Sequence, residues 1–288
     1  MSKNLVGALF MIASMFSFTV NDTFIKLTDG ALPLPQLLTL RGILATLGML
    51  GLAVALRGLR LNLGRRVWML IGLRSLAEIG AAYFFLTALL NMPLANVTAV
   101  LQALPLAVTF GAFLIYGDPI GWRRMSAILI GFLGMLLILR PGPDGFSIWS
   151  IYALIAVVCV TARDLITRRM PPEVPSLTVA VGNTVIVTAF FALLSVPVEW
   201  RPMSGDLWGL IAGSALFIIG GYLFSVQTMR VGEISFIAPF RYTGLIWALL
   251  IGWLVFGHWP SPLTLLGAFI VVAAGMFTFW REQRLSHS

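Results

Sequence analysis

Charged residues are scarce in this sequence. Asp, Glu, Lys and Arg make up 10% of its 288 residues, whereas 59% are hydrophobic and the mean hydropathy is +0.96. An ordinary soluble domain carries about 25% charged residues. This composition excludes a soluble globular protein and predicts a multi-pass membrane protein in which no polar stretch is long enough to fold as a separate soluble domain.

Cysteine and histidine are almost absent as well. Cys159 is the only cysteine, so the chain can form neither an intrachain disulfide nor a CxxC metal site. His258 lies near a span end and His287 in the C-terminal tail, and the HExxH, GxSxG and GxxxxGK[ST] motifs are missing. The sequence therefore predicts no enzyme, no metal and no cofactor. Because the GxxxxGK[ST] phosphate loop is missing, any transport across the membrane is expected to use a gradient, exchange or downhill flux in place of ATP hydrolysis.

Long apolar runs fill most of the chain. A helix needs about 20 residues to cross the hydrocarbon core of a bilayer, and the runs of that length predict an all-α protein with ten transmembrane helices. Their connections are short, so consecutive helices are expected to be antiparallel neighbours. The predicted spans are roughly 4–25, 33–56, 67–90, 93–116, 122–140, 148–168, 176–197, 206–229, 233–257 and 262–281.

Lys and Arg residues are distributed unequally over the connections. If the N-terminus is cytoplasmic, twelve of them lie in cytoplasmic segments, three lie outside and four lie within spans. Cytoplasmic loops are enriched in Lys and Arg, so both termini are predicted to be cytoplasmic. The net charge of +8 is not gathered in a basic patch with interleaved aromatic residues, which excludes nucleic acid as a partner.

The two halves of the chain repeat each other weakly. FTVNDTFIKL in the first span aligns with CVTARDLITR in the sixth at an offset of 142 residues, which pairs Asp22 with Asp164. FLIYGDPIGW aligns with WLVFGHWPSP at an offset of about 140. The sequence thus predicts two five-helix repeats, residues 1–143 and 144–288. Because five is odd, the repeats have opposite orientations in the membrane, with a binding site expected near the midplane where they meet.

Several stretches resemble one known group of proteins. They are the arginine in the second span (LLTLRGILATL), the run ALLNMPLANVTAVLQALPLAVTFGAFLIYGD, a Gly-rich helix at the end of each half and the short basic C-terminus. With ten spans in two repeats, nearly the whole chain resembles the EamA branch of the drug/metabolite transporter superfamily. Its abundance of aromatic residues is most similar to that of the bacterial aromatic amino acid exporters.

The resemblance implies efflux of metabolites or drugs across a bacterial inner membrane by alternating access, without ATP hydrolysis. The family usually ends its fourth and ninth spans with Gly-Glu. The matching positions here are Gly117-Asp118 and Gly257-His258, which puts any role of that carboxylate in doubt.

Charged side chains inside apolar spans are rare and costly, and they indicate function by default. Glu78 lies near the middle of the third span with Arg74 one turn before it; it is interpreted either as a proton-coupling or amine-binding group or as half of an internal ion pair. Arg241 either binds a substrate carboxylate or pairs with Asp164 or Glu78. With polar and aromatic side chains near mid-span included, the candidate substrate-binding residues are Glu78, Tyr83, Asn96, Gln102, Arg241, Tyr242 and Trp247.

Other charged residues lie near span ends and are interpreted as gates or as structural ion pairs. Asp22 and Arg41 are expected to pair with each other, and inverted symmetry places Asp164 at the other mouth. Arg163 and Asp164 are adjacent and point about 100° apart on a helix, so we expect that they cannot pair face to face and that each needs another partner or water. The candidate gating residues are Asp22, Arg41, Arg74, Arg163 and Asp164.

Taken together, these patterns predict a monomeric, multi-pass inner-membrane transporter whose partners are a small molecule and the lipid bilayer. It is expected to export small amphiphilic metabolites, most specifically aromatic and other apolar amino acids, while Arg241, Glu78 and Gln102 hold the polar end of the substrate. The alternative is a proton-coupled exporter of cationic drugs or metabolites in which Glu78 binds the cation.

Overall fold

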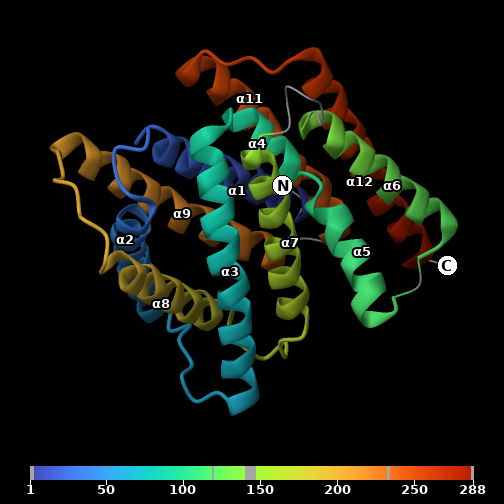
Figure 1. Ribbon diagram of the computed structural model, residues 1–288. Helices are drawn as coiled ribbons and strands as arrows, with labels where there is room; N and C mark the ends of the chain where they lie inside the picture. Colours follow the sequence, from blue (N-terminus) through green and yellow to red (C-terminus); the bar gives the residue numbers. More distant parts are fainter. Residues whose placement is uncertain (1–2, 119, 140–146, 232–233, 287–288) are drawn as a thin grey trace.

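The protein is a bundle of long helices. The computed structural model describes residues 3–118, 120–139, 147–231 and 234–286, and all its regular structure within these ranges is helical (Figure 1). The proposed boundary between the repeats, 143/144, lies outside the described residues. Ten stretches in the described ranges are long and apolar enough to span a membrane, as predicted: Lys3–Lys26, Leu34–Ala55, Arg65–Asn91, Leu94–Tyr116, Trp122–Leu139, Ile148–Arg168, Ser176–Ser195, Gly205–Thr228, Ala238–Phe256 and Pro262–Arg281.

Eight of these spans are single helices, and two are broken. The single helices are α1 (Lys3–Lys26), α2 (Leu34–Ala55), α3 (Arg65–Asn91), α6 (Trp122–Leu139), α7 (Ile148–Arg168), α8 (Ser176–Ser195), α9 (Gly205–Val231) and α12 (Pro262–Ser286). The fourth span divides into α4 (Leu94–Leu101) and α5 (Leu104–Tyr116). The ninth span, with the short α10 (Ile234–Ile237) before it, consists of the 3₁₀ turn η1 (Ala238–Tyr242) and α11 (Thr243–Phe256).

Each break carries a proline. Pro105 lies in the first turn of α5 and Pro239 in the first turn of η1. Proline lacks a backbone N–H and clashes with the carbonyl one turn earlier, so it favours the start of a helical segment over its interior. The breaks lie at equivalent places in the two repeats and divide each of these spans into two arms.

The two repeats pack into one shared core. The main helix pairs are α1 with α9, α3 with α7, α2 with α8, and α6 with α12, and each pair joins one helix from each half. Replacing each helix by its equivalent in the other half turns the α1–α9 pair into the α7–α3 pair. The α2–α8 and α6–α12 pairs are unchanged by this replacement. The helix packing therefore has the two-fold pattern expected of the repeats, and the largest cluster of buried apolar residues includes residues of both halves.

Two contacts mark the pseudo-two-fold axis. Thr46 Oγ1 and Thr188 Oγ1 lie 3.2 Å apart at a sequence separation of 142, and the side-chain amide of Gln102 donates to the backbone carbonyl of Tyr242 over 3.4 Å at a separation of 140. These separations equal the repeat offsets. Since equivalent residues can meet only where the axis passes, one contact marks it between α2 and α8 and the other between the broken spans.

Glycines let α6 and α12 approach closely. A Cβ atom added to Gly134 would lie 2.9 Å from the carbonyl oxygen of Gly267 and 2.8 Å from Cγ2 of Ile270. Gly134 thus permits backbone contact between the two helices, as is common in membrane bundles.

Gly134→Ala is expected to destabilise the protein by about 1–3 kcal/mol, because the added methyl group overpacks this contact. Gly51→Ala is the matched control: Gly51 lies in α2 and has open space at the Cβ position, so the higher helix propensity of alanine makes this change neutral or stabilising. Thermal unfolding in detergent measures both. Equal midpoints for the two variants would contradict the close packing.

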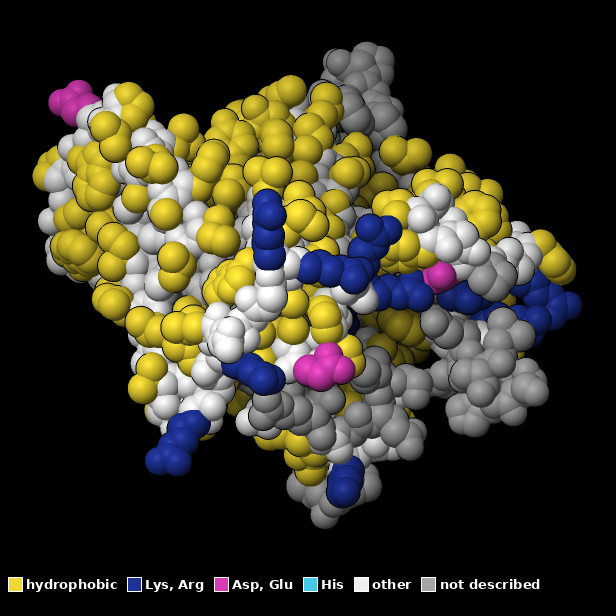
Figure 2. Space-filling view, turned by 90° about the horizontal axis from the view of Figure 1, so that it is seen from below, with side chains coloured by type: hydrophobic (Ala, Val, Ile, Leu, Met, Phe, Trp, Pro, Cys, Tyr) yellow, Lys and Arg dark blue, Asp and Glu magenta, His cyan; other side chains and the backbone are white. Residues whose placement is uncertain are grey.

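One end of the bundle is strongly basic. Figure 2 shows Lys and Arg side chains gathered on the face seen from below, with few Asp and Glu among them. The basic face, as we call it, is formed by the α2–α3 and α7–α8 connections and the start of α6. Its exposed arginines are Arg57, Arg60, Arg65, Arg66, Arg123, Arg168 and Arg169.

Candidate functional site

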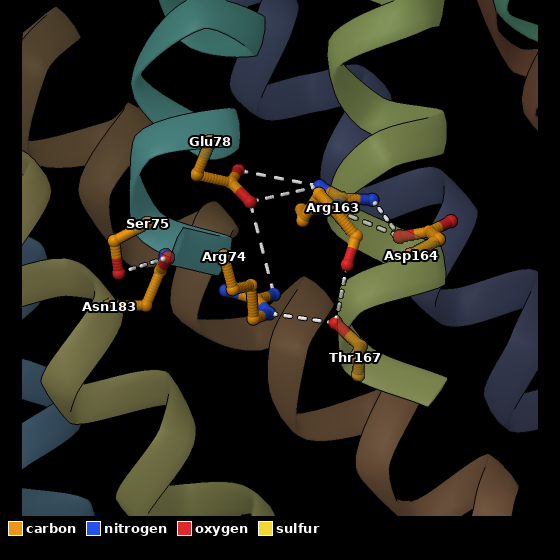
Figure 3. A network of polar contacts seen from close by, with 7 residues as sticks. All are labelled: Arg74, Ser75, Glu78, Arg163, Asp164, Thr167 and Asn183. Carbon is orange, nitrogen blue, oxygen red and sulfur yellow. Dashed lines mark hydrogen bonds and ion pairs between the residues drawn. The ribbon is translucent and has the colours of Figure 1, made fainter. Parts of the chain in front are cut away.

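A network of charges joins α3 to α7 (Figure 3). Arg163 on α7 donates from Nη1 to both carboxylate oxygens of Glu78 on α3, at 3.1 and 3.4 Å. Arg74 Nη2 lies 3.9 Å from the same carboxylate, and Arg74 Nε donates to Thr167 Oγ1 over 3.1 Å. The side chains of Arg74, Glu78 and Arg163 are 13%, 16% and 19% exposed. Glu78 is therefore a largely buried carboxylate held by two guanidinium groups.

Arg163 also pairs with its neighbour. Its Nε and Nη2 each lie 2.9 Å from Asp164 Oδ1, so the expectation that adjacent residues 100° apart on a helix cannot pair is wrong. The arginine side chain is long enough to fold along the helix surface and reach both Glu78 and Asp164 (Figure 3). The network contains two cations and two carboxylates, which limits the net charge placed inside the membrane.

A second polar network joins α1, α2 and α9. Asn21 Nδ2 donates to Asp22 Oδ1 over 2.9 Å, while Asn21 Oδ1 accepts bonds from Arg41 Nη2 at 3.0 Å and Ser214 Oγ at 2.8 Å. The predicted direct pair between Asp22 and Arg41 is absent from the part of the chain that the structure describes. The Asn21 amide joins them, because it can donate to a carboxylate and accept from a guanidinium at once.

The two networks occupy equivalent places in the repeats. Asn21 and Asp22 in the first repeat correspond to Arg163 and Asp164 in the second, at an offset of 142 residues. In each repeat the first of these residues donates a hydrogen bond of 2.9 Å to the carboxylate of the second. The residue equivalent to Arg41 at this offset is Asn183, whose Oδ1 accepts a hydrogen bond from Ser75 Oγ at 3.1 Å. The repeat offset was visible in the sequence, but these bridging amides and serines were not selected from it as candidates.

Gln102 and Tyr242, both predicted to bind substrate, lie together at the two broken spans. Gln102 caps α4, and Tyr242 ends η1. The Tyr242 hydroxyl is buried against Gly275 of α12, and a larger residue at position 275 would collide with it. This hydroxyl has no hydrogen-bond partner among the described residues. The breaks thus bring the Gln102 amide and the Tyr242 carbonyl together at the pseudo-two-fold axis.

Three further candidates present polar groups that no described residue satisfies. Asn96 Oδ1 on α4 and Trp247 Nε1 on α11 are buried without a partner. Trp247 packs edge-on against Phe16 of α1, with 5.1 Å between ring centroids. The partly buried Arg241 side chain has no ion pair in the described ranges. Of its two interpretations, pairing with Asp164 or Glu78 does not occur, and both carboxylates bind Arg163.

Tyr83 lies apart from these groups. Its ring contacts Phe84 and Tyr152 at centroid distances of 5.3 and 6.5 Å, and the residue is 38% exposed. It belongs to an aromatic cluster between α3 and α7, which the structure does not connect to Gln102 or Arg241.

Two cavities lie beside, and not among, the candidate substrate residues. A narrow crevice between α1, α2 and α9, too small to hold a ligand, is lined by Arg41 and Ser214 together with mostly apolar side chains. A groove of about 400 Å³ lies between α6 and α12 and is lined by Trp122, Arg123, Ser126, Ala127, Ile130, Ala274 and Phe277. The candidate cluster around the broken spans opens into neither.

Ten spans in two interlocked repeats, with polar networks at equivalent places and broken spans on the axis, define an inverted-repeat membrane transporter. Comparison with known families agrees: residues 5–140 and 147–280 each match the model of the EamA-like transporter family. The chain belongs to this family and is a multi-pass inner-membrane transporter of small molecules.

Proteins similar to this chain are named for different substrates. The riboflavin transporter of Vibrio cholerae is 27% identical over 97% of this chain and 95% of its own length. The pseudopaline exporter of Pseudomonas aeruginosa is 24% identical over 93% of this chain and 94% of its own length. The S-adenosylmethionine uptake transporter of Rickettsia prowazekii is 23% identical over 67% of this chain and 65% of its own length. A solved crystal structure, 18% identical, has the same fold, with a TM-score of 0.69 over 97% of this chain and 98% of that chain.

Proposed function

We propose that this transporter exports small amphiphilic molecules that carry a carboxylate, most specifically amino acids with aromatic or other apolar side chains. The observation that carries this proposal is the contrast between two arginines. Arg163 is saturated by two acidic side chains, whereas Arg241 has no acidic partner in the described ranges. A guanidinium cannot be neutralised at ordinary pH, so Arg241 is available for a substrate carboxylate.

Neutral polar and aromatic groups at the two broken spans fit the rest of such a substrate. Gln102, Tyr242 and Trp247 offer neutral donors and acceptors, and the Trp247 and Phe16 rings offer an apolar surface. Aromatic rings pack well against one another. A zwitterion with an aromatic side chain matches this combination of one cation, neutral polar groups and aromatic faces.

The alternative, a cationic substrate bound by Glu78, has less support. Both Glu78 oxygens already face Arg163, and Arg74 lies close to one of them. A cationic substrate would have to displace a guanidinium whose hydrogen bonds to the carboxylate are charge-assisted. Glu78 is better suited to tying α3 to α7 than to receiving a cation.

The proposed mechanism is rocking of the helices about the pseudo-two-fold axis, so that the site near Gln102 and Tyr242 opens to each membrane face in turn. We propose that the basic face is cytoplasmic, following the distribution of Lys and Arg. This orients the protein but not the flux. Export is proposed from the resemblance to amino acid exporters, since the named relatives include both an exporter and an uptake transporter.

Flux into liposomes that contain the purified protein tests the proposal. Labelled phenylalanine and tryptophan are expected to enter saturably without an imposed proton gradient, whereas a labelled lipophilic cation is not. Protein-free liposomes and competition by unlabelled substrate are the controls. Cation flux that requires a proton gradient, with amino acids inert, would contradict the proposal and favour the alternative.

A further inference from the structure

The end of α1 is fastened to two other spans by one lysine. Lys26 Nζ donates to the backbone carbonyls of Leu89 and Met92, at 2.8 and 2.7 Å, and lies 5.7 Å from the centre of the Phe256 ring. Leu89 and Met92 lie at the junction of α3 and α4, and Phe256 is the last residue of α11. Lys26 therefore joins three spans at the face opposite the basic face.

The end of α7 is fastened in a similar way at the basic face. Arg168 Nη1 donates to Asp118 Oδ2 over 2.6 Å, and the Arg168 guanidinium lies 5.3 Å from the centre of the Tyr116 ring. Arg169 lies over the same ring at 4.9 Å. The Tyr116 hydroxyl donates to the Leu165 carbonyl over 2.6 Å. Tyr116 is the last residue of α5, so these contacts join α7 to α5.

These two fastenings are equivalent under the repeat. Lys26 and Arg168 are 142 residues apart, and Tyr116 and Phe256 are 140 apart, which are the two repeat offsets. Each therefore places a cation from the end of the first helix of its repeat on the ring that ends the broken span of the other repeat. Cation–π contact stabilises such a pair most when both groups are shielded from water.

Each ring lies at the tip of an arm. α5 and α11 are the second parts of the broken spans, and they run from the breaks near Gln102 and Tyr242 out to Tyr116 and Phe256. At 1.5 Å per residue each arm is about 20 Å long. A small rotation at a break therefore moves the tip by several ångströms, and the cation at the tip opposes that movement.

We propose that Lys26 and Arg168 are alternating latches that determine which membrane face the transporter opens to. Release of Lys26 from Phe256 and from the Leu89 and Met92 carbonyls frees the α11 arm and opens the face opposite the basic face. Release of Arg168 from Asp118, followed by separation of Tyr116 from Arg168, Arg169 and the Leu165 carbonyl, frees the α5 arm and opens the basic face. Both latches are closed in this structure. They are positioning residues for transport, and the proposal requires alternating access but no particular substrate.

The latches differ in one respect that provides an independent test. The basic-face latch contains an exposed ion pair, with the Arg168 and Asp118 side chains 56% and 39% exposed, whereas Lys26 bonds to backbone carbonyls. Salt screens exposed ion pairs effectively. High salt is therefore expected to open the basic face of the unaltered protein and to leave the other latch closed.

Distances between spin labels at the two mouths test the proposal in the full-length protein in nanodiscs. Cys159→Ser removes the single cysteine, and labels are placed at exposed positions 27 and 259 for one face and 121 and 173 for the basic face. Lys26→Met is expected to add a longer distance at the first pair only, and Arg168→Gln at the second pair only. Lys26→Arg keeps the cation and is expected to resemble the parent.

The matched control is Arg66→Gln, which removes an exposed charge from the basic face without touching either latch. If Lys26→Met yields no folded protein, Phe256→Leu replaces it, since it removes the ring but keeps an apolar side chain; the same lengthening at the first pair is expected. Unchanged distances in both latch variants, or lengthening of the same pair by both, would overturn the proposal. Equal lengthening of both pairs by 1 M salt would also overturn it.

Discussion

Glu78→Gln is expected to destabilise the protein by about 2–4 kcal/mol, because removing one partner of a buried ion pair leaves the other charge uncompensated. The variant keeps Arg74 and Arg163 but leaves Asp164 as their only nearby acid in this network. The side chains are 13–28% exposed, so the expected loss is somewhat smaller than for a fully buried pair. Thermal or chemical unfolding in detergent measures it.

A double-mutant cycle separates this pairing from a general loss of packing. Arg163→Met alone leaves Glu78 and Asp164 with Arg74, whereas the double variant leaves one cation and one acid. The double variant is therefore expected to be more stable than the sum of the single effects predicts. Asp118→Asn is the control, since it breaks an exposed ion pair worth about 0–1 kcal/mol. Strict additivity at Glu78 and Arg163 would show that the network does not act as a unit.

Arg241→Gln is expected to raise the KM for amino acid substrates by about 10- to 100-fold, the loss that follows from removing a hydrogen bond between charged groups. The melting temperature is expected to change little, because the Arg241 side chain has no ion pair among the described residues. Initial rates of labelled phenylalanine uptake into liposomes over a range of concentrations, with unfolding measured on the same preparations, check both parts.

Arg241→Lys distinguishes the geometry of the site from its charge. Lysine keeps the cation but cannot bind a carboxylate with two parallel hydrogen bonds, so its KM is expected to lie between those of the parent and Arg241→Gln. If the Gln and Lys variants transport amino acids like the parent, Arg241 does not bind the substrate carboxylate. A large fall in stability would instead indicate a structural role for this arginine.

Most of the architecture followed from local properties of the sequence. Span length and apolar composition predicted ten helices, because a membrane helix satisfies its backbone hydrogen bonds internally and needs no distant residue for them. The repeat offset then anticipated which positions are equivalent. It correctly paired Asp22 with Asp164 as mirror positions in the two halves.

The contacts between polar side chains on different helices were predicted less well. Spacing on one helix suggested that Arg74 is the partner of Glu78, yet Arg163 of α7 binds Glu78 more closely. Asp22 and Arg41 were expected to touch directly, but Asn21 lies between them. Tyr83 was grouped with the site and lies in a separate aromatic cluster. In each case the helix was predicted correctly, and the error concerned what another helix presents to it.

The sequence by itself determined that this protein is an all-helical membrane transporter of ten spans, built from two repeats. Each span depends on residues close together in the chain, and the repeat is a property of the residue order alone. Only the tertiary structure decided that Arg163 is neutralised while Arg241 is not, and that Lys26 and Arg168 fasten the tips of equivalent arms. The rotation of each helix about its own axis is set by packing against all its neighbours at once. Long, flexible arginine and lysine side chains then choose among the partners that this packing brings within reach.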